Sequence, residues 1–358
     1  MSRILAIDIG AGTMDILYFD TDSELHYKAV VRSPVRTIAE QIRSARGKLL
    51  IAGSEMGGGA VSQALKQRAA AEQVLISEAA AATLSHDLDR VRSAGLEVID
   101  GKRCGELLAG GDYTVIALTD LQLDRIESVI EGFGVDFDFD VVGVCVQDHG
   151  VAPPGTSHLD YRHNHYVPIL DAEPSPDALL YHGNEVPADM SRLLAVRDAA
   201  LGLPSRSIYL MDSGMAAILG ASLDVSVRGS ERAIVLDVAT SHTVAASFDG
   251  DELCGFVEYH TKDINVSRLD SLLKELADGH LEHAQILAEG GHGAYARKAL
   301  GFDSIEIILA TGPRRALLSG SSLEIVLGAP LGDNMMTGTA GLLEAIRRRE
   351  GWGGAPFG

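Results

Sequence analysis

Residues 4–20 constrain the fold more than any other part of the chain. An apolar run from Ile4 ends near Asp8, a short segment with two glycines follows, and a second apolar run begins at Asp15. Two apolar runs joined by so short a glycine-containing segment predict a β-hairpin. Glycines in the turn let a phosphate approach the backbone amides closely. The two acids offer the oxygen ligands that Mg²⁺ prefers. The hairpin therefore predicts nucleotide binding.

The composition predicts an ordered globular protein. The chain has 358 residues, 46% of them hydrophobic, which is enough for two or more domains. A formal net charge of −20 argues against nucleic acid or an anionic membrane surface as a partner. No apolar segment reaches the roughly 18 residues of a membrane span. The first apolar run begins the hairpin directly, so no signal peptide is expected. We therefore expect a cytoplasmic protein that binds neither nucleic acid nor a membrane.

The three cysteines, Cys104, Cys145 and Cys254, lie far apart in the sequence. They form no CxxC-type ligand set, which argues against an iron–sulfur cluster or a zinc ribbon within one chain. We expect buried, reduced thiols.

Expected strands and helices alternate along the chain, which is typical of an α/β protein. An Ala-rich helix is expected over residues 78–94, and another helix over 281–299. Residues 148–188 hold most of the prolines and break the pattern, as functional loops often do. The expected domains are a first lobe (1–147), an irregular insertion or cleft-rim loop (148–188), a second lobe (189–331), and a connecting helix with a frayed tail (332–358).

A near-repeat of the hairpin begins at Arg232. Here too an apolar strand ends in an acid, Asp237, and a short polar turn leads into another apolar run. A duplicated hairpin, each copy followed by helices and further strands, implies two similar lobes that face a cleft.

Four segments together resemble the actin-like ATPase superfamily of sugar kinases, Hsp70-type chaperones and actin. Residues 8–15 and 237–243 resemble its two phosphate loops, residues 307–313 its adenosine turn, and the final helix its C-terminal connecting helix. The resemblance implies an α/β fold of two actin-like (ribonuclease H-like) lobes around a nucleotide cleft. It also implies ATP and Mg²⁺ as cofactors.

The resemblance implies roles for single residues. Asp8 would lie near Mg²⁺, through water, and Asp237 would be the general base or would position the nucleophile. One departure is Ala239, where the superfamily generally has glycine, because a methyl here would crowd the terminal phosphate. An ordinary hairpin turn, a strand-end acid and a helix start are the structural alternatives for these segments. The other implied nucleotide-binding residues are Gly10, Gly12, Thr13, Asp15, Thr240, Ser241, Thr243, Thr311 and Gly312.

A narrower set of motifs is similar to one prokaryotic family whose members are labelled pyruvate formate-lyase-activating proteins. That label implies radical SAM chemistry, which needs a three-cysteine cluster motif, and this sequence has none. We therefore expect no radical SAM activity. The motifs are residues 55–59, 146–150, 242–243, 258–261, 290–293 and 332–338.

Histidines crowd one short segment, at positions 149, 158, 163 and 165. Four imidazoles with Asp148 and Asp160 are able to bind a divalent ion, but their spacing matches no ligand template. Hydrogen-bonded or surface histidines are the alternative. Elsewhere, residues 55–59 are either a flexible loop or a helix entrance that holds an anion. The candidates for a second substrate or partner are Glu55, Asp148, His149, Arg162, His165 and His260.

Two hypotheses about function follow. The first is an ATP-dependent small-molecule kinase or ATPase that requires Mg²⁺. The second is a nucleotide-dependent switch or activator that acts on a protein partner and has little or no turnover. The sequence identifies neither the phosphoryl acceptor nor the protein partner. It leaves the oligomeric state open, including a homodimer that shares ligands between chains.

Overall fold

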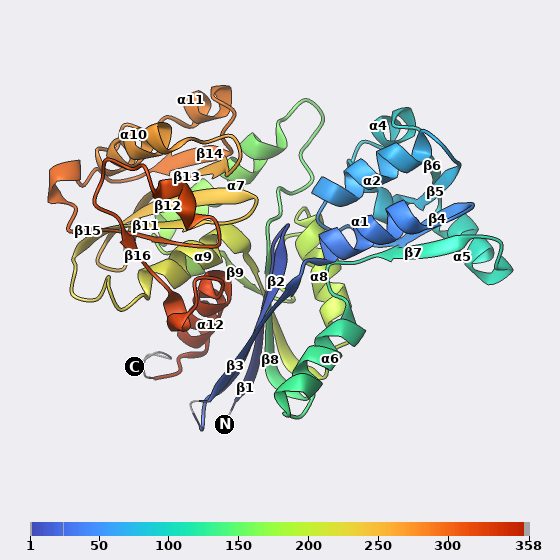
Figure 1. Cartoon of the computed structure of the whole chain (residues 1–358), viewed down its shortest axis with the longest axis horizontal. Helices are drawn as coiled ribbons and strands as arrows, with labels where there is room; N and C mark the ends of the chain where they lie inside the picture. Colours follow the sequence, from blue (N-terminus) through green and yellow to red (C-terminus); the bar gives the residue numbers. More distant parts are fainter. Residues whose placement is uncertain (1, 24, 354–358) are drawn as a thin grey trace.

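The computed structural model describes residues 2–23 and 25–353, which form three β-sheets (Figure 1). The first sheet has the order β3(His26–Arg32)-β2(Thr13–Asp20)-β1(Arg3–Ile9)-β8(Phe139–Val146)-β10(Ser205–Asp212)-β9(Leu180–His182). The second has the order β14(Gly293–Ala296)-β13(Glu252–His260)-β12(His242–Asp249)-β11(Arg232–Val238)-β15(Ile307–Thr311)-β16(Val326–Leu327). The third has the order β6(Glu97–Ile99)-β5(Val74–Ser77)-β4(Leu49–Gly53)-β7(Thr114–Leu118).

The first two sheets are built on one plan. Each starts with an antiparallel hairpin, β1–β2 or β11–β12, made of a seven-residue and an eight-residue strand. A third antiparallel strand follows on one side, β3 or β13, and parallel strands lie on the other, β8 and β10 or β15 and β16. This repetition confirms the expected α/β fold of two similar lobes.

The central strand β1 is buried on both faces, which explains its unbroken apolar sequence. Successive side chains of a strand point to opposite faces. Ile4 and Ala6 therefore join one core with helices α9 (Ser213–Ser222) and α12 (Thr337–Glu350). Leu5 and Ile7 join another core with α6 (Leu123–Phe133) and α8 (Ser191–Ala200). The sheet is thus the middle layer of a three-layer lobe.

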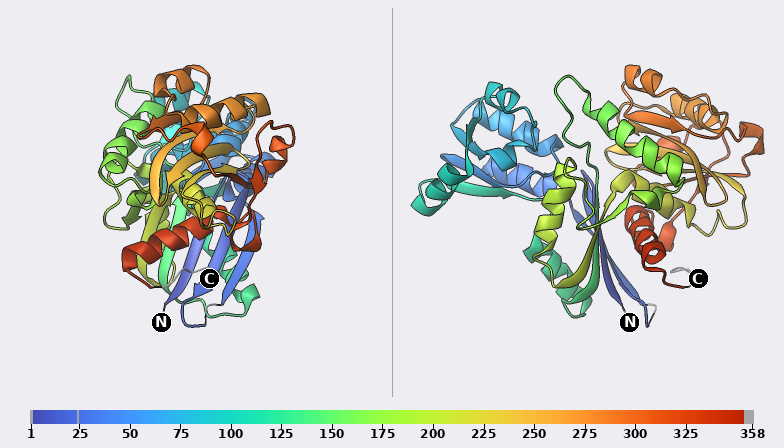
Figure 2. Two further views of the ribbon diagram at one scale, coloured as in Figure 1. Left: turned by 90° about the vertical axis from the view of Figure 1, so that its left-hand side faces the viewer. Right: turned by 180° about the vertical axis from the view of Figure 1, so that it is seen from behind.

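The third sheet forms a separate unit inserted between β3 and β8. Its strands are all parallel, and a core of its own packs them against helices. Figures 1 and 2 show this unit, in blue and teal, and the second lobe, in yellow to red, on opposite sides of the first sheet. Its helices are α1 (Pro34–Ser44), α2 (Gly59–Ala69), α3 (Glu78–Ala81), α4 (Leu88–Ser93) and α5 (Gly101–Gly110).

The segment 148–188 corrects one sequence expectation, because it is not irregular throughout. It contains α7 (His158–Ala172), η1 (Pro176–Leu179) and the strand β9. The side chain of Ser157 caps α7, which accommodates Pro168 in its interior. The density of prolines therefore does not indicate an irregular segment here, since one of them, Pro168, lies within a helix. Strands β9 and β10 also join the first sheet, so that sheet extends beyond the expected lobe boundary at residue 147.

The prediction of two long helices is also wrong. Residues 78–94 form the short helices α3 and α4, since the Asp87 side chain accepts hydrogen bonds that start a new helix. Residues 281–299 form only α11 (His283–Ala288) and then β14, because Gly290 and Gly293 have positive φ. Helix α10 (Val266–Ala277) precedes this region. The end of the expected frayed tail, residues 354–358, lies outside the described residues.

Among the described residues, every helix is too short or too polar to cross a bilayer. The remaining short elements are the 3₁₀ helices η2 (Phe302–Ser304), η3 (Arg315–Leu318) and η4 (Pro330–Gly332).

Helices α9 and α12 pack backbone to backbone between the lobes. A Cβ atom at Gly220 would lie 1.8 Å from the carbonyl oxygen of Thr337, and one at Gly341 would lie 1.8 Å from that of Ala216. Helix α9 contacts strands of both lobes, whereas α12 contacts β1, β2 and β8 of the first sheet. The two glycines therefore determine how closely the lobes approach.

We predict that Gly220→Ala destabilises the protein, because the new methyl pushes the two helix backbones apart. The expected cost is on the order of 3 kcal/mol, measured by chemical unfolding. Gly105→Ala is the matched control, since a Cβ at this exposed helical position meets no atom within 4 Å. The control should gain about 0.4–1 kcal/mol. A Gly220→Ala variant as stable as the wild type would contradict this packing argument.

Candidate active site

A cleft of about 890 Å³ lies where the two lobes and the inserted unit meet. The turn at residues 10–13 and the turn at 239–242 line it from the two lobes, and residues 55–59 line it from the inserted unit. The two turns are equivalent. In one the Gly10 N–H donates to the carbonyl of Thr13 at 3.0 Å, and in the other the Ala239 N–H donates to that of His242 at 3.0 Å.

The two turns come into direct contact across the cleft. A Cβ atom at Gly12 would lie 2.8 Å from Oγ1 of Thr240. Glycine is therefore needed here for the close approach of the other turn, although its φ is not positive. The contact brings together two segments that are more than 200 residues apart in the sequence.

Three carboxylates lie at the base of the turns. Asp8 pairs with Asp15 across the β1–β2 hairpin, and Asp237 has the position in β11 that Asp8 has in β1. Ser213 donates a 2.8 Å hydrogen bond to Asp8, whereas Oδ1 of Asp15 is buried without a partner. An unpartnered buried carboxylate oxygen is costly, which suits a site that receives a cation.

Burial raises the pKa of all three carboxyl groups. The pKa of Asp8 rises to about 6, that of Asp15 to about 8 and that of Asp237 to about 7. The charge of Asp8 adds to the rise at Asp15 and Asp237. Mutual repulsion of this kind is relieved when a cation binds between the groups.

Most residues singled out from the sequence line this cleft. Thr243 and Thr311 do not, since both are buried and bonded to Thr261 and Thr337. Gly312 lies behind Asp237 and is followed by the cleft residue Pro313. The candidates that line the cleft are Asp8, Gly10, Gly12, Thr13, Asp15, Glu55, Asp148, His149, Asp237, Ala239, Thr240, Ser241 and His260.

Arg162 lies behind the cleft wall, in a buried network of charges. Its Nη1 donates to Glu258 at 2.7 Å and its Nη2 donates to Asp212 at 2.9 Å. All three side chains are at most 5% exposed. Burial alone would raise the pKa of Glu258, but the guanidinium outweighs it and the pKa falls well below the usual range. Arg162 therefore positions neighbouring groups and is not open to a second substrate.

The histidine-rich segment is dispersed by the fold. His149 and His158 line the cleft, His163 stacks on His283 with ring centres 3.6 Å apart, and His165 bonds to Tyr181 at 3.1 Å. The structure does not gather these four imidazoles around one point. Within the described residues, a different set comes together at the cleft, namely His242, His260 and His292.

Several cleft residues were not found from the sequence. Ser213 bonds to Asp8 but is 205 residues away from it, and no spacing motif links them. Arg192 pairs with Asp120 at 2.8 Å, and Asp120 accepts a 3.2 Å bond from the N–H of Gly57. This pair positions the glycine-rich strand–helix turn. Among the weaker candidates, Asp148 caps backbone N–H groups of Gly150 and Leu193, and Glu55 pairs with His86 at 3.2 Å.

The repeated sheet order and the facing turns define a two-lobed protein of the actin-like class. A family model matches residues 56–317, which is well over half of the chain. The protein therefore belongs to the family described as "Putative pyruvate format-lyase activating enzyme (DUF1786)". This confirms the family expected from the sequence. The three cysteines are free and buried, as expected, on α5, β8 and β13.

No curated protein matches the chain. Three solved structures are similar over nearly the whole length. One is a "putative N-acetylmannosamine kinase, from Listeria monocytogenes", with 11% sequence identity, coverage of 97% of this chain and 99% of that chain, and a TM-score of 0.34. Another is a ROK hexokinase from Thermus thermophilus, with 12% identity, coverage of 97% and 99% of the two chains, and a TM-score of 0.31. The third is a ROK family glucokinase from Streptomyces griseus in complex with glucose and AMPPNP, with 12% identity, coverage of 96% and 97%, and a TM-score of 0.30. At these TM-scores the likenesses carry no part of the argument below.

We predict that the stability of the Asp15→Asn variant, relative to the wild type, rises with pH. The pKa of Asp15 rises from its ordinary value of 3.8 to about 8 in the folded protein. Between these values the folded state keeps a proton that the unfolded chain has released, so the wild type loses stability as the pH rises. Asparagine removes this loss.

Melting temperatures in metal-free buffer between about pH 5 and pH 8 test this sign. The exposed residue Asp112 offers a control, Asp112→Asn, whose curve should run parallel to that of the wild type. A difference between Asp15→Asn and the wild type that stays constant or falls with pH would show that Asp15 is not protonated in the folded state.

Proposed function

We propose that the cleft binds Mg-ATP between the two turns and that the protein is an ATP-dependent small-molecule kinase or ATPase. One observation carries the proposal. Two equivalent hairpin turns, with Asp8 and Asp237 at the same position of equivalent strands, meet at one cleft. A clamp of this form suits a ligand that carries several phosphate groups.

The backbone of the turns supports phosphate binding. The bonds that close the two turns use the N–H groups of Gly10 and Ala239. In the described part of the chain, the N–H groups of Ala11, Gly12, Thr240 and Ser241 have no hydrogen-bond partner. Unbonded amides that converge on a cleft are the donors that bind phosphate oxygens.

The carboxylates at the base of the cleft fit a hydrated Mg²⁺ ion. Asp8 and Asp15 supply oxygen ligands, and the unpartnered oxygen of Asp15 is a place for a positive charge or its water. Bound Mg²⁺ would neutralise charge on the phosphates. The pKa of Asp237, about 7, suits a general base at neutral pH, since it lies near the operating range. Asp237 would take the proton of the attacking hydroxyl, and Ser213 would orient Asp8.

The residue at position 239 bears on whether the protein turns ATP over or only binds it. Its φ is not positive, so the turn itself does not require glycine. At the equivalent Gly10, a Cβ atom would meet its nearest neighbour, the Thr13 oxygen, only at 3.6 Å. Ala239 lines the cleft, and its methyl group would occupy room beside the terminal phosphate of a bound ATP. This methyl favours a second candidate, a nucleotide-dependent switch that acts on a protein partner with slow turnover.

We predict that Mg-ATP raises the melting temperature of the wild type, because a ligand selective for the folded state stabilises it. Asp8→Asn should lose most of this Mg²⁺-dependent rise. Asp237→Asn should keep the rise and lose turnover by about 10²- to 10⁴-fold, as expected for a lost general base. Asp112→Asn, exposed and outside the cleft, should behave as the wild type.

The reaction products separate the two candidates. ADP release that requires one added metabolite identifies a kinase. Slow unstimulated hydrolysis, with affinity for a partner that differs between ATP and ADP, identifies a switch. If neither nucleotide shifts the melting temperature in the presence of Mg²⁺, both candidates are wrong.

We further predict that Ala239→Gly tightens binding of a non-hydrolysable ATP analogue relative to ADP, on the order of tenfold, which is the usual effect of one methyl group. On this proposal the added room would lie beside the third phosphate, which ADP lacks. Gly10→Ala is the matched opposite change and should weaken analogue binding by a similar factor. Calorimetric titration of both variants measures the ratio. If the ratio of analogue affinity to ADP affinity is the same in Ala239→Gly and the wild type, the methyl group of Ala239 does not hinder the terminal phosphate.

A further inference from the structure

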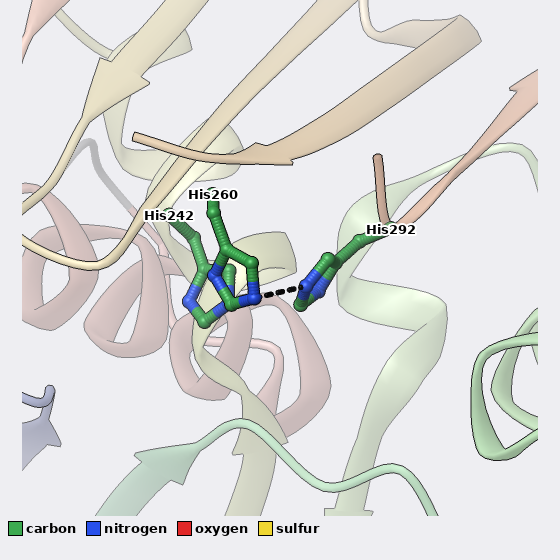
Figure 3. A group of neighbouring side chains, drawn as sticks. All are labelled: His242, His260 and His292. Atoms are coloured by element: carbon green, nitrogen blue, oxygen red, sulfur yellow. Dashed lines mark hydrogen bonds between the residues drawn. The ribbon is translucent and has the colours of Figure 1, made fainter. Parts of the chain in front are cut away.

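Three histidines gather at the edge of the cleft, at the ends of three neighbouring strands (Figure 3). His242 begins β12 and lies directly opposite His260, which ends β13. His292 precedes β14, and its backbone N–H donates to the carbonyl of Glu258 at 2.8 Å. The antiparallel register places opposite side chains on one face, so the imidazoles converge. All three residues line the cleft.

Two ring nitrogens of this cluster bond to each other, and two more have no hydrogen-bond partner. One nitrogen from each ring lies within 4.8 Å of the other two, and Nε2 of His260 faces Nε2 of His292 at 2.9 Å. Nε2 of His242 and Nδ1 of His292 are buried with no hydrogen-bond partner. Two facing imidazole nitrogens need a proton or a cation between them.

Another histidine pair, His163 with His283, shows what distinguishes the cluster. Both ring nitrogens of His283 already have partners, in Asp160 and in the N–H of Ala294. In the cluster, Nε2 of His242 and Nδ1 of His292 have none. An imidazole nitrogen with a free lone pair is the form that binds a metal ion.

A carboxylate lies next to the cluster, as in many metal sites. Oε1 of Glu258 is 3.7 Å from Nδ1 of His292, just beyond hydrogen-bond range. Arg162 and Gln147 hold the two oxygens of Glu258 in place. A carboxylate that faces the second nitrogen of a ligating histidine fixes the tautomer and strengthens the ligand. This position of Glu258 leaves Nε2 of His292 as the nitrogen that faces the cluster.

We propose that His242, His260 and His292 bind one divalent transition-metal ion of the class represented by Zn²⁺ and Co²⁺. Three nitrogens around a tetrahedral ion at 2.0–2.1 Å would lie roughly 3.3 Å apart. One separation is 2.9 Å and none exceeds 4.8 Å, so small ring rotations would complete the site. Imidazole ligands favour such ions over Mg²⁺, which prefers oxygen.

Three protein ligands leave a fourth position open, and this position faces the cleft. His149 lies near the cluster, with a ring centre 5.9 Å from that of His292 and an unpartnered buried Nε2. The open position would hold water or an oxygen atom of a substrate. The site does not depend on nucleotide binding, since its ligands are separate from Asp8, Asp15 and the turn amides.

Titration of the metal-free full-length protein with Co²⁺, in excess Mg²⁺ and without nucleotide, tests the proposal. We expect one Co²⁺ per chain, with the visible absorption of a four-coordinate nitrogen-bound ion. His260→Gln and His292→Gln should each weaken binding by more than about 100-fold, since even outer groups of metal sites contribute 10- to 100-fold. Thermal melting of each variant checks that it folds, and two variants are used so that the test survives if one fails to fold.

Two further variants locate the ion. His280→Gln changes an exposed histidine outside the cleft and should leave Co²⁺ binding unchanged. Asp15→Asn removes a carboxylate of the proposed Mg²⁺ site and should also leave it unchanged. Absence of Co²⁺ binding, full binding by folded His292→Gln and His260→Gln, or loss of binding in Asp15→Asn would each overturn the proposal. A failure of ATP to bind would leave this result unaffected.

Discussion

The buried guanidinium of Arg162 joins the two lobes at the back of the cleft. One of its partners, Asp212, ends β10 in the first sheet, and the other, Glu258, lies on β13 in the second. Three buried charges are tolerated only when they are paired in good geometry, so this network fixes how the strands of the two lobes face each other. The contact between the turns and the position of Glu258 beside His292 both depend on that placement.

Glycines complete this arrangement where the two lobes meet. Each of the two equivalent acids, Asp8 and Asp237, packs closely against a glycine. A Cβ atom at Gly338 would lie 2.0 Å from an oxygen of Asp8, and one at Gly312 would lie 2.5 Å from an oxygen of Asp237. Gly338 belongs to α12, and Gly312 follows β15. Both glycines stand in motifs visible in the sequence, but their role is to admit a carboxylate from another strand. The contact of Gly312 with nucleotide remains a prediction.

The hairpins and their acids could be predicted from the sequence because the signals are local. Alternating and unbroken apolar runs, a short turn and a repeat specify the strands of both lobes. Charge pairing between distant segments has no such signal, so Arg162 was expected at an open site and lies in a buried network instead. The histidine cluster was missed for the same reason, since three separate strands supply it. The helix expected over residues 78–94 failed because alanine content does not reveal that Asp87 starts a new helix.

The cleft offers two kinds of ligand set, and their chemistry separates the ions that they would take. Carboxylates beside the turns suit a hard ion that keeps its water, whereas imidazole nitrogens suit a borderline transition metal. If both proposals hold, the carboxylates would take Mg²⁺ and the histidines would take the transition-metal ion, because each ligand type binds the other ion less well. Arg162 lowers the pKa of Glu258 beside the histidines, whereas burial, with a smaller contribution from a neighbouring acid, raises the pKa of Asp8 and of Asp15 at the turns. A bound cation would therefore stabilise the carboxylates at the turns more than it would stabilise the histidine cluster. Such stabilisation suits a site that binds its ion together with a polyanionic ligand.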